Sequence, residues 1–169
     1  MMTDCPYKCP PSGRQTTVGV EPAIPCKIRS LWHTAAVIRP PHFLLPLLTP
    51  VVGSLGLYLQ GAPAPLAATV ETAFDSLSRK RGLLGRASVP ADYALVIAPC
   101  NLVHTFTMTF DIDVIFAARD GRIVKLRPGL RPGRVSGAIG AFAAIEMSPG
   151  SIERAGLAVG QRLEVRSKP

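Results

Sequence analysis

Three side chains that can carry a proton, His104, Asp113 and Glu146, lie within or beside apolar stretches of the sequence. Imidazole and carboxyl groups in such surroundings can act as general acids or bases, or can line a polar cleft. Asp113 requires hydrogen bonds or a cation there, because an isolated carboxylate is costly to bury. Arg81 or Arg86 could supply the cation through a bidentate pair. These five residues form the predicted ligand-binding set.

Each of the acidic and imidazole groups also has a structural interpretation. His104 alternates with hydrophobic residues, and an imidazole in that setting is more often a hydrogen-bonded core side chain than a ligand-binding one. Asp113 could form a structural ion pair or cap a turn, and Glu146 could cap a helix that begins near Pro149. Asp111 adds a second carboxylate beside Asp113, but two such neighbours supply too few ligands for a metal site.

No group of residues has the spacing of a known catalytic or cofactor site. Cys100 and His104 would lie about 13 Å apart along an extended chain, too far for a Cys–His nucleophile pair. The glycines of residues 81–86 lack the spacing and the Lys-Ser/Thr ending of a phosphate-binding loop. Near the N-terminus, Cys5 and Cys9 are one pair at zinc-ligand spacing, without the second pair that structural zinc sites use. The sequence therefore predicts no metal and no cofactor.

The domains that position these residues follow from a change of composition near residue 65. The chain has 169 residues, of which 47% are hydrophobic and 18% charged, with a net charge of +8. This composition excludes wholesale disorder, and 17 prolines with 15 glycines exclude a helical bundle. Most prolines fall in residues 1–65, which we predict to be an irregular or disordered tail rich in Pro and Cys. Residues 66–169 suffice for a single compact domain.

The stretch from Phe43 to Gly61 is apolar and close to the length of a membrane span. Basic residues precede it, and the Ala-Pro-Ala that follows resembles a signal-cleavage site. Pro46 and Pro50 interrupt the stretch and favour a loosely ordered segment instead. Two locations therefore stay open: membrane-anchored or exported if the stretch spans or is cleaved, and cytoplasmic otherwise.

The strictest alternation in the chain covers residues 100–110 and predicts one long strand. One face of it would hold the hydrophobic residues and His104, and the other the threonines. A slip of one residue would turn every phenylalanine to the wrong side, so this strand is expected to fix the register of the sheet.

Shorter patterns predict the rest of the domain. Apolar runs on both sides of Asp120-Gly121 predict a β-hairpin. Parallel β-α-β units are not expected, because no long helix separates two strands. The predicted fold is mainly β, a small and mostly antiparallel barrel or sandwich of six or seven short strands with two short helices. The further strands are expected at residues 68–74, 94–98, 141–147 and 157–165, and the helices at about 75–84 and 149–156.

Several motifs occur in a distinctive order in this second part. They read RGLLGR at 81–86, HTFTM at 104–108, IDVIF at 112–116, DG at 120–121, EMSPG at 146–150 and GLAVG at 156–160. In order and spacing they resemble the domain of unknown function 192 family of bacteria and archaea, over about residues 67–167. The resemblance implies a compact, mainly β domain, often exported, without an established activity. The family usually has Phe-Pro-Ile-Asp where this chain has Phe-Asp-Ile-Asp at 110–113.

The leading functional hypothesis is a non-enzymatic β domain that binds a small ligand or a protein partner, and that associates with the cell envelope if the apolar stretch anchors it. The first alternative is an unrecognised enzyme that uses His104 and Asp113, with Asp111 as a further candidate, as its acid and base groups. The second is a weak nucleic-acid binder, disfavoured because aromatic residues for base stacking are only 6% of the chain. Its basic hairpin would comprise Arg119, Arg122, Lys125, Arg127, Arg131 and Arg134.

Overall fold

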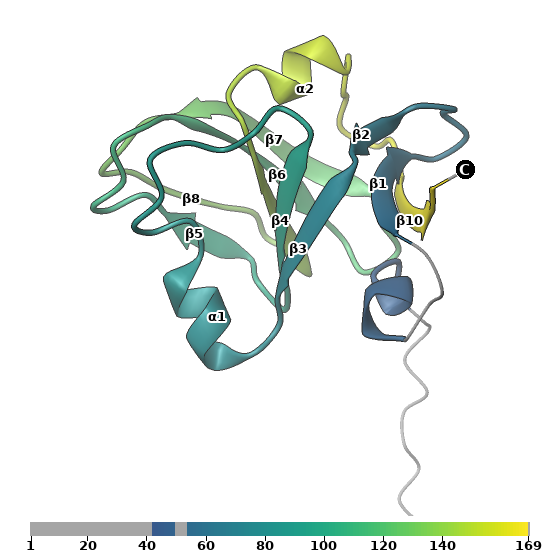
Figure 1. Ribbon diagram of the computed structural model, residues 1–169, viewed down its shortest axis with the longest axis horizontal. Coiled ribbons are helices and arrows are strands. Elements are labelled where there is room, and N and C mark those ends of the chain that lie inside the picture. The colour runs from purple at the N-terminus through teal and green to yellow at the C-terminus, as the bar shows by residue number, and fades with distance from the viewer. Residues whose placement is uncertain (1–41, 50–53, 169) are drawn as a thin grey trace, which may run out of the picture. The chain divides into compact units, whose positions relative to one another are not determined.

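Ten strands and three short helices make up the part of the chain that the computed structural model describes, residues 42–49 and 54–168 (Figure 1). The predicted mainly β fold is confirmed, with more strands than the six or seven expected. The strands are β1 (Leu55–Leu59), β2 (Pro65–Ala67), β3 (Thr69–Ala73), β4 (Tyr93–Ile97), β5 (Leu102–His104), β6 (Ile112–Ala117), β7 (Ile123–Leu130), β8 (Val135–Gly137), β9 (Ala143–Met147) and β10 (Leu163–Ser167). The helices are the 3-10 turn η2 (Leu45–Leu48), α1 (Ser76–Arg81) and α2 (Ser151–Arg154).

A five-stranded sheet of order β3-β4-β9-β6-β7 forms the centre of the domain. Its three inner strands, β4, β9 and β6, are buried at every residue. Continuous apolar runs of this kind are typical of strands that are covered on both faces. The hairpin between β6 and β7 is confirmed, and its turn residue Gly121 has the positive φ of 85° that favours glycine.

Each face of the five-stranded sheet carries its own hydrophobic core. One core contains residues of the three-stranded sheet β10-β1-β2 and of α2, including Leu57, Leu163 and Ile152. The other contains Leu83, which follows α1, and Val103 of the two-stranded sheet β5-β8. The arrangement is a sandwich of layers and not a closed barrel, and it places α1 and β5 on the same side of the central sheet (Figure 1).

The prediction of one long strand over residues 100–110 is wrong. Only Leu102–His104 is extended, as β5, and the chain then turns at Phe106 and Thr107, where Thr107 has φ 67°. Up to Phe106 the two faces are also reversed, because Val103 and Thr105 are buried whereas Phe106 is 48% exposed. Beyond the turn, Met108 is buried and Thr107 is exposed, as the alternation predicts.

Hydrogen bonds of Thr105 explain this reversal. Its hydroxyl donates to the carbonyl of Arg131 at 2.6 Å and accepts from the backbone N–H of Arg134 at 3.0 Å. A threonine with its hydroxyl satisfied in this way can be buried at little cost. The connector before β8 thus holds Thr105 inside, and Phe106 is turned towards solvent.

A parallel pair is also present, contrary to the sequence prediction. β3 and β4 pair in parallel over their full length. The crossover between them, residues 74–92, contains only the six residues of α1 in helical form. A parallel pair requires a connection of a dozen or more residues, but that connection need not be mostly helix.

The compact unit extends upstream of residue 66, where the sequence placed the start of the domain. β1 lies within the apolar stretch from Phe43 to Gly61 and pairs with both β10 and β2. Leu57 and Tyr58 of β1 are fully buried, so this part of the stretch is hydrophobic because it is core. Among the described residues no helix has the length and hydrophobicity to cross a membrane. The cysteine pair and most of the predicted tail lie outside the described residues.

Candidate ligand-binding cleft

A cleft of about 420 Å³ opens between α1 and residues 99–104, on one face of the five-stranded sheet. The basic residues Arg79, Lys80 and Arg81 line it from α1, and Cys100 and His104 line it from the opposite side. Its lining also includes buried apolar side chains and a single acidic residue. The apolar ones are Leu83, Ile97, Val103 and Met108, and the acidic one is Glu146.

Glu146 lies in the middle of an apolar surface. It belongs to β9, the central strand, and its cross-strand neighbours are Leu95 on β4 and Val114 on β6. Only 4% of its surface is exposed, and its Oε2 atom has no hydrogen-bond partner within the described part of the chain. Burial raises the pKa of this carboxyl to about 7, because a charged carboxylate loses its hydration there. The carboxyl group of Glu146 therefore titrates near neutral pH.

Gly82 brings the backbone close to this carboxyl. It ends α1, with φ 48°, and its N–H donates to the carbonyl of Ser78. A Cβ atom at Gly82 would lie 3.9 Å from Oε2 of Glu146. Because Gly82 has no side chain, no side-chain atom of this residue covers Oε2 of Glu146.

The position of the basic residues is set by the capping of α1. Asp75 is the N-cap, and its Oδ1 accepts hydrogen bonds from the N–H groups of Leu77 and Ser78, both at 2.9 Å. A hydrogen bond from the Ser78 hydroxyl, together with these backbone contacts, lowers the pKa of Asp75 to about 2. The helix starts at Ser76, so the three basic residues fall in its last turn, where the helix dipole favours positive charge.

Cys100 and His104 face the cleft but differ in their surroundings. The Cys100 thiol donates to the carbonyl of Leu102 at 3.2 Å, and burial raises its pKa, so the sulfur is a thiol at neutral pH. His104 is exposed, and its ring stacks on that of Phe106 with centroids 5.2 Å apart. The interpretation of His104 as a core side chain is therefore wrong.

Asp113 lies on the other side of the sheet and is fully buried. Its Oδ1 accepts from the N–H of Gly129 at 2.9 Å, and its Oδ2 from the N–H of Ile152 at 2.8 Å. Both oxygens are therefore occupied by backbone donors, one of which is in the first turn of α2. Among the described residues Asp113 forms no ion pair, with Arg81, Arg86 or any other cation, so the predicted Asp–Arg pair is wrong.

Capping of α2 was predicted for Glu146, and this is also wrong. The N-cap of α2 is Gly150, and no side chain caps the helix from there. Successive residues of a strand point to opposite faces, and Asp113 pairs across the sheet with Met147, the residue after Glu146. The carboxylate of Asp113 therefore faces α2, and the carboxyl of Glu146 faces α1.

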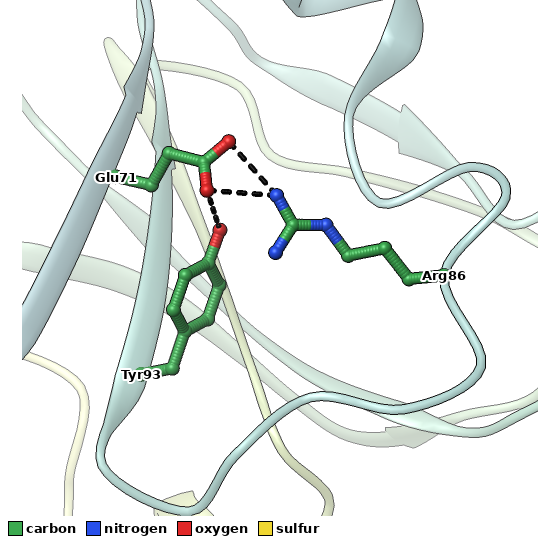
Figure 2. Close-up of polar contacts among 3 residues, drawn as sticks. All are labelled: Glu71, Arg86 and Tyr93. Atoms are coloured by element: carbon green, nitrogen blue, oxygen red, sulfur yellow. Dashed lines mark hydrogen bonds and ion pairs between the residues drawn. The ribbon is translucent and has the colours of Figure 1, made fainter.

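Arg86 belongs to a separate cluster, which Figure 2 shows. Its Nη2 lies 2.7 Å from Oε2 of Glu71, and the Tyr93 hydroxyl donates to the same oxygen at 2.7 Å. The guanidinium also lies 5.1 Å from the centroid of the Tyr93 ring. The hydrogen bonds from Arg86 and Tyr93 lower the pKa of Glu71. They also connect the loop after α1, which contains Arg86, to β3 and β4. Arg86 is thus a structural residue in the observed fold.

The structure therefore divides the five predicted site residues. Arg81, His104 and Glu146 line one cleft, whereas Arg86 and Asp113 are elsewhere with satisfied partners. Arg86, His104 and Asp113 therefore do not share a cleft. Sequence reasoning missed the contribution of Arg79, Lys80 and Cys100, although a run of basic residues directly before Gly82 was visible.

The basic hairpin has partners within the domain. The guanidinium of Arg119 lies 4.8 Å from the centroid of the Phe142 ring. The ammonium of Lys125 donates to the carbonyl of Gly137 at 2.8 Å and lies 5.9 Å from the Phe116 ring centroid. Over residues 42–49 and 54–168, no group of three or more His, Cys, Asp or Glu side chains is placed to hold a metal ion.

Comparison with known proteins gives one family and two similar structures. Residues 59–165 match the model of the DUF192 family, whose description is uncharacterized ACR. A protein of unknown function from Novosphingobium aromaticivorans matches 56% of this chain and 73% of its own at 22% identity, with a TM-score of 0.53. A suspected transcription regulator from Sinorhizobium meliloti matches 69% of this chain and 98% of its own at 22% identity, with a TM-score of 0.58. No curated protein matches the chain. At such identity the likeness shows the fold alone.

Proposed function

Since the chain belongs to the DUF192 family, which carries no assigned activity, we propose from the geometry of the cleft that the domain is a binding module. It holds a small polar ligand between α1 and residues 99–104 and catalyses no reaction on it.

The unpaired Oε2 atom of Glu146 carries this proposal. A buried polar group without a hydrogen-bond partner costs about 1–3 kcal/mol of stability. Native structures therefore contain few such groups, and each calls for an explanation. A ligand that provides the missing hydrogen bond removes this cost and gains affinity from it.

The lining of the cleft supports the same function. Small-molecule sites are mostly apolar and contain a few polar groups that orient the ligand. Here Leu83, Ile97 and Val103 are buried apolar walls, and Glu146 provides the polar group. The exposed basic residue Arg81 adds positive charge at the edge.

The positions of the titratable groups argue against the enzymatic alternative. A general acid and a general base must both come within hydrogen-bond reach of the reacting group. His104 is exposed beside the cleft, whereas Asp113 is sealed under α2 with both oxygens occupied. The two residues therefore cannot act on one substrate in this fold.

Ligand-induced changes in Tm test the proposal. The full chain would be screened against amino acids, short carboxylates and phosphate monoesters, alongside the variants Glu146→Leu and Glu153→Gln. Glu153 is an exposed glutamate of α2 and serves as the matched control. We expect at least one compound class to raise the Tm of the wild type and of Glu153→Gln, and to lose this effect in Glu146→Leu. Equal shifts in all three proteins, or no shift from any compound, would contradict a ligand at Glu146.

A further inference from the structure

We propose that the ligand of this cleft is a short aminocarboxylate, whose ammonium group pairs with Glu146 and whose carboxylate faces the basic side chains of α1. This inference rests on the proposed function of the cleft and adds the chemical class of the ligand.

The floor of the cleft favours an ammonium group. Within the described residues no cation forms an ion pair with Glu146, and Leu95 and Val114 flank it on the neighbouring strands. A buried carboxylate requires a positive charge or several hydrogen bonds to compensate for its lost hydration. A primary ammonium supplies one positive charge and three donors in a compact group.

The edge of the cleft favours a carboxylate on the same ligand. Arg79 directs its guanidinium to the carbonyl of Phe74 and to the Ser76 hydroxyl at 3.3 Å. Lys80 and Arg81 are exposed, and neither makes a side-chain hydrogen bond to any residue that the structure describes. A simple amine would be repelled by this basic edge, whereas a zwitterion presents a negative charge to it.

The lining between these polar groups favours a short hydrocarbon linker. Leu83, Val103 and Met108 are at most 8% exposed, and all three line the cleft. They offer no hydrogen-bonding side chain, so the matching part of the ligand is a run of methylene groups, whose burial contributes about 0.8 kcal/mol each.

Proton linkage distinguishes this ligand from a simple anion. An ammonium group binds the carboxylate form of Glu146, so binding releases a proton below the pKa of about 7 and its affinity rises with pH up to that value. A simple anion would instead accept a hydrogen bond from the protonated form, and its affinity would fall as the pH rises. The other charged or titratable groups lining the cleft are Arg79, Lys80, Arg81, Cys100 and His104.

Titration calorimetry on the full chain tests the inference at pH 6 and pH 8. The probes are glycine, 4-aminobutanoate and 6-aminohexanoate, with butanoate and butylamine as the singly charged controls. We expect one aminocarboxylate to bind about tenfold more tightly at pH 8 than at pH 6. We expect butanoate and butylamine to bind at least about tenfold more weakly than it does. Glu146→Gln should lose the binding and its pH dependence, and Glu153→Gln should keep both.

Each other outcome overturns a defined part of the inference. One such outcome is that butanoate binds as tightly as 4-aminobutanoate does, and more weakly at pH 8 than at pH 6. That result would show that the ligand is a simple anion and not a zwitterion, and the proposed function of the cleft would still hold. If butylamine binds as tightly as the aminocarboxylates, the basic side chains of α1 do not contact a carboxylate of the ligand. If none of the five probes binds, the aminocarboxylate class is wrong, and the Tm screen with Glu146→Leu separately decides whether the cleft binds a ligand.

Discussion

Two carboxyl groups on adjacent strands show how one residue type serves opposite purposes. Asp113 and Glu146 are both buried, on β6 and β9 respectively. Asp113 accepts two backbone hydrogen bonds, which link β6 to the neighbouring strand β7 and to α2. Glu146 has an unpaired oxygen and borders a cleft. The first carboxyl stabilises the fold, and the second destabilises it at neutral pH, which is the pattern expected of a group kept for binding.

The pH dependence of stability should reveal the buried Glu146. Its pKa in the folded protein is about 7, against an ordinary value of 4.5. The folded state therefore binds more protons than the unfolded state between these values, and the free energy of unfolding falls as pH rises through this window. The expected loss is about 3 kcal/mol, most of it reached at pH 7 and complete near pH 8, above the folded-state pKa. Urea denaturation of the wild type and Glu146→Gln from pH 4 to 8 measures it as a difference between the two proteins.

Other acidic groups do not obscure this measurement. The pKa values of Glu71, Asp75 and Asp120 are lowered by their partners. Their stabilising contributions are therefore present above their ordinary pKa values and decline only at lower pH. A wild-type stability that runs parallel to that of Glu146→Gln from pH 4.5 to 7 would show that Glu146 ionises normally.

At the scale of elements, tight turns hold the layers in register. The turn between β6 and β7 contains Gly121, whose N–H donates to the carbonyl of Ala118 at 3.0 Å. A Cβ atom added to Gly121 would lie 2.4 Å from the carbonyl oxygen of Leu163, which is on β10. This glycine is therefore required twice, by its positive φ and by the close approach of another strand.

Replacing Gly121 by alanine should destabilise the domain more than the same change at Gly133. Both have positive φ, but a Cβ at Gly133 meets no atom within 4 Å. Gly133→Ala should cost about 1–2 kcal/mol for the left-handed conformation alone. Gly121→Ala should cost about 1–3 kcal/mol more, because the β10 backbone must move. Denaturant unfolding of both variants measures the difference. An equal loss of unfolding free energy in the two variants would mean that the β10 backbone at Leu163 moves away from the new Cβ atom without strain.

At the scale of the whole molecule, the outer sheet closes one core of the sandwich. β1 is the middle strand of the sheet β10-β1-β2, so it joins the last strand, β10, to β2. Leu44, Leu57 and Tyr58 are fully buried, although all three precede residue 66. The domain is thus completed by residues that are outside the segment that resembles the family in sequence.

Shortening the chain tests this completion. A chain that begins at Leu66 lacks β1 and three fully buried side chains, each worth about 1.5–3 kcal/mol. Their sum is comparable with the whole stability of an ordinary domain, so we expect this version to be unfolded or aggregated. A chain that begins at Pro40, where the compact unit starts, should unfold with the same cooperativity as the full chain. Circular dichroism and thermal unfolding distinguish the two. A folded domain starting at Leu66 would show that β1 is dispensable.

Local patterns in the sequence determined the class of fold and several of its elements. The Asp120-Gly121 hairpin follows from turn chemistry, and the apolar runs of β4 and β9 follow from their burial on both faces. These features depend on neighbours in the chain, so they are visible without the fold. The family motifs were recognisable for the same reason.

Only the tertiary structure decided which residues share a site. Thr105 is inside and Phe106 outside because the distant connector before β8 bonds the threonine hydroxyl, which the alternation of residues 100–110 could not show. Asp113 and Glu146 face opposite sides because of the register between β6 and β9. The burial and the hydrogen bonds of a carboxyl group depend on strands that are far away in sequence. These two properties distinguish Asp113, whose oxygens are satisfied within the fold, from Glu146, which is available to a ligand.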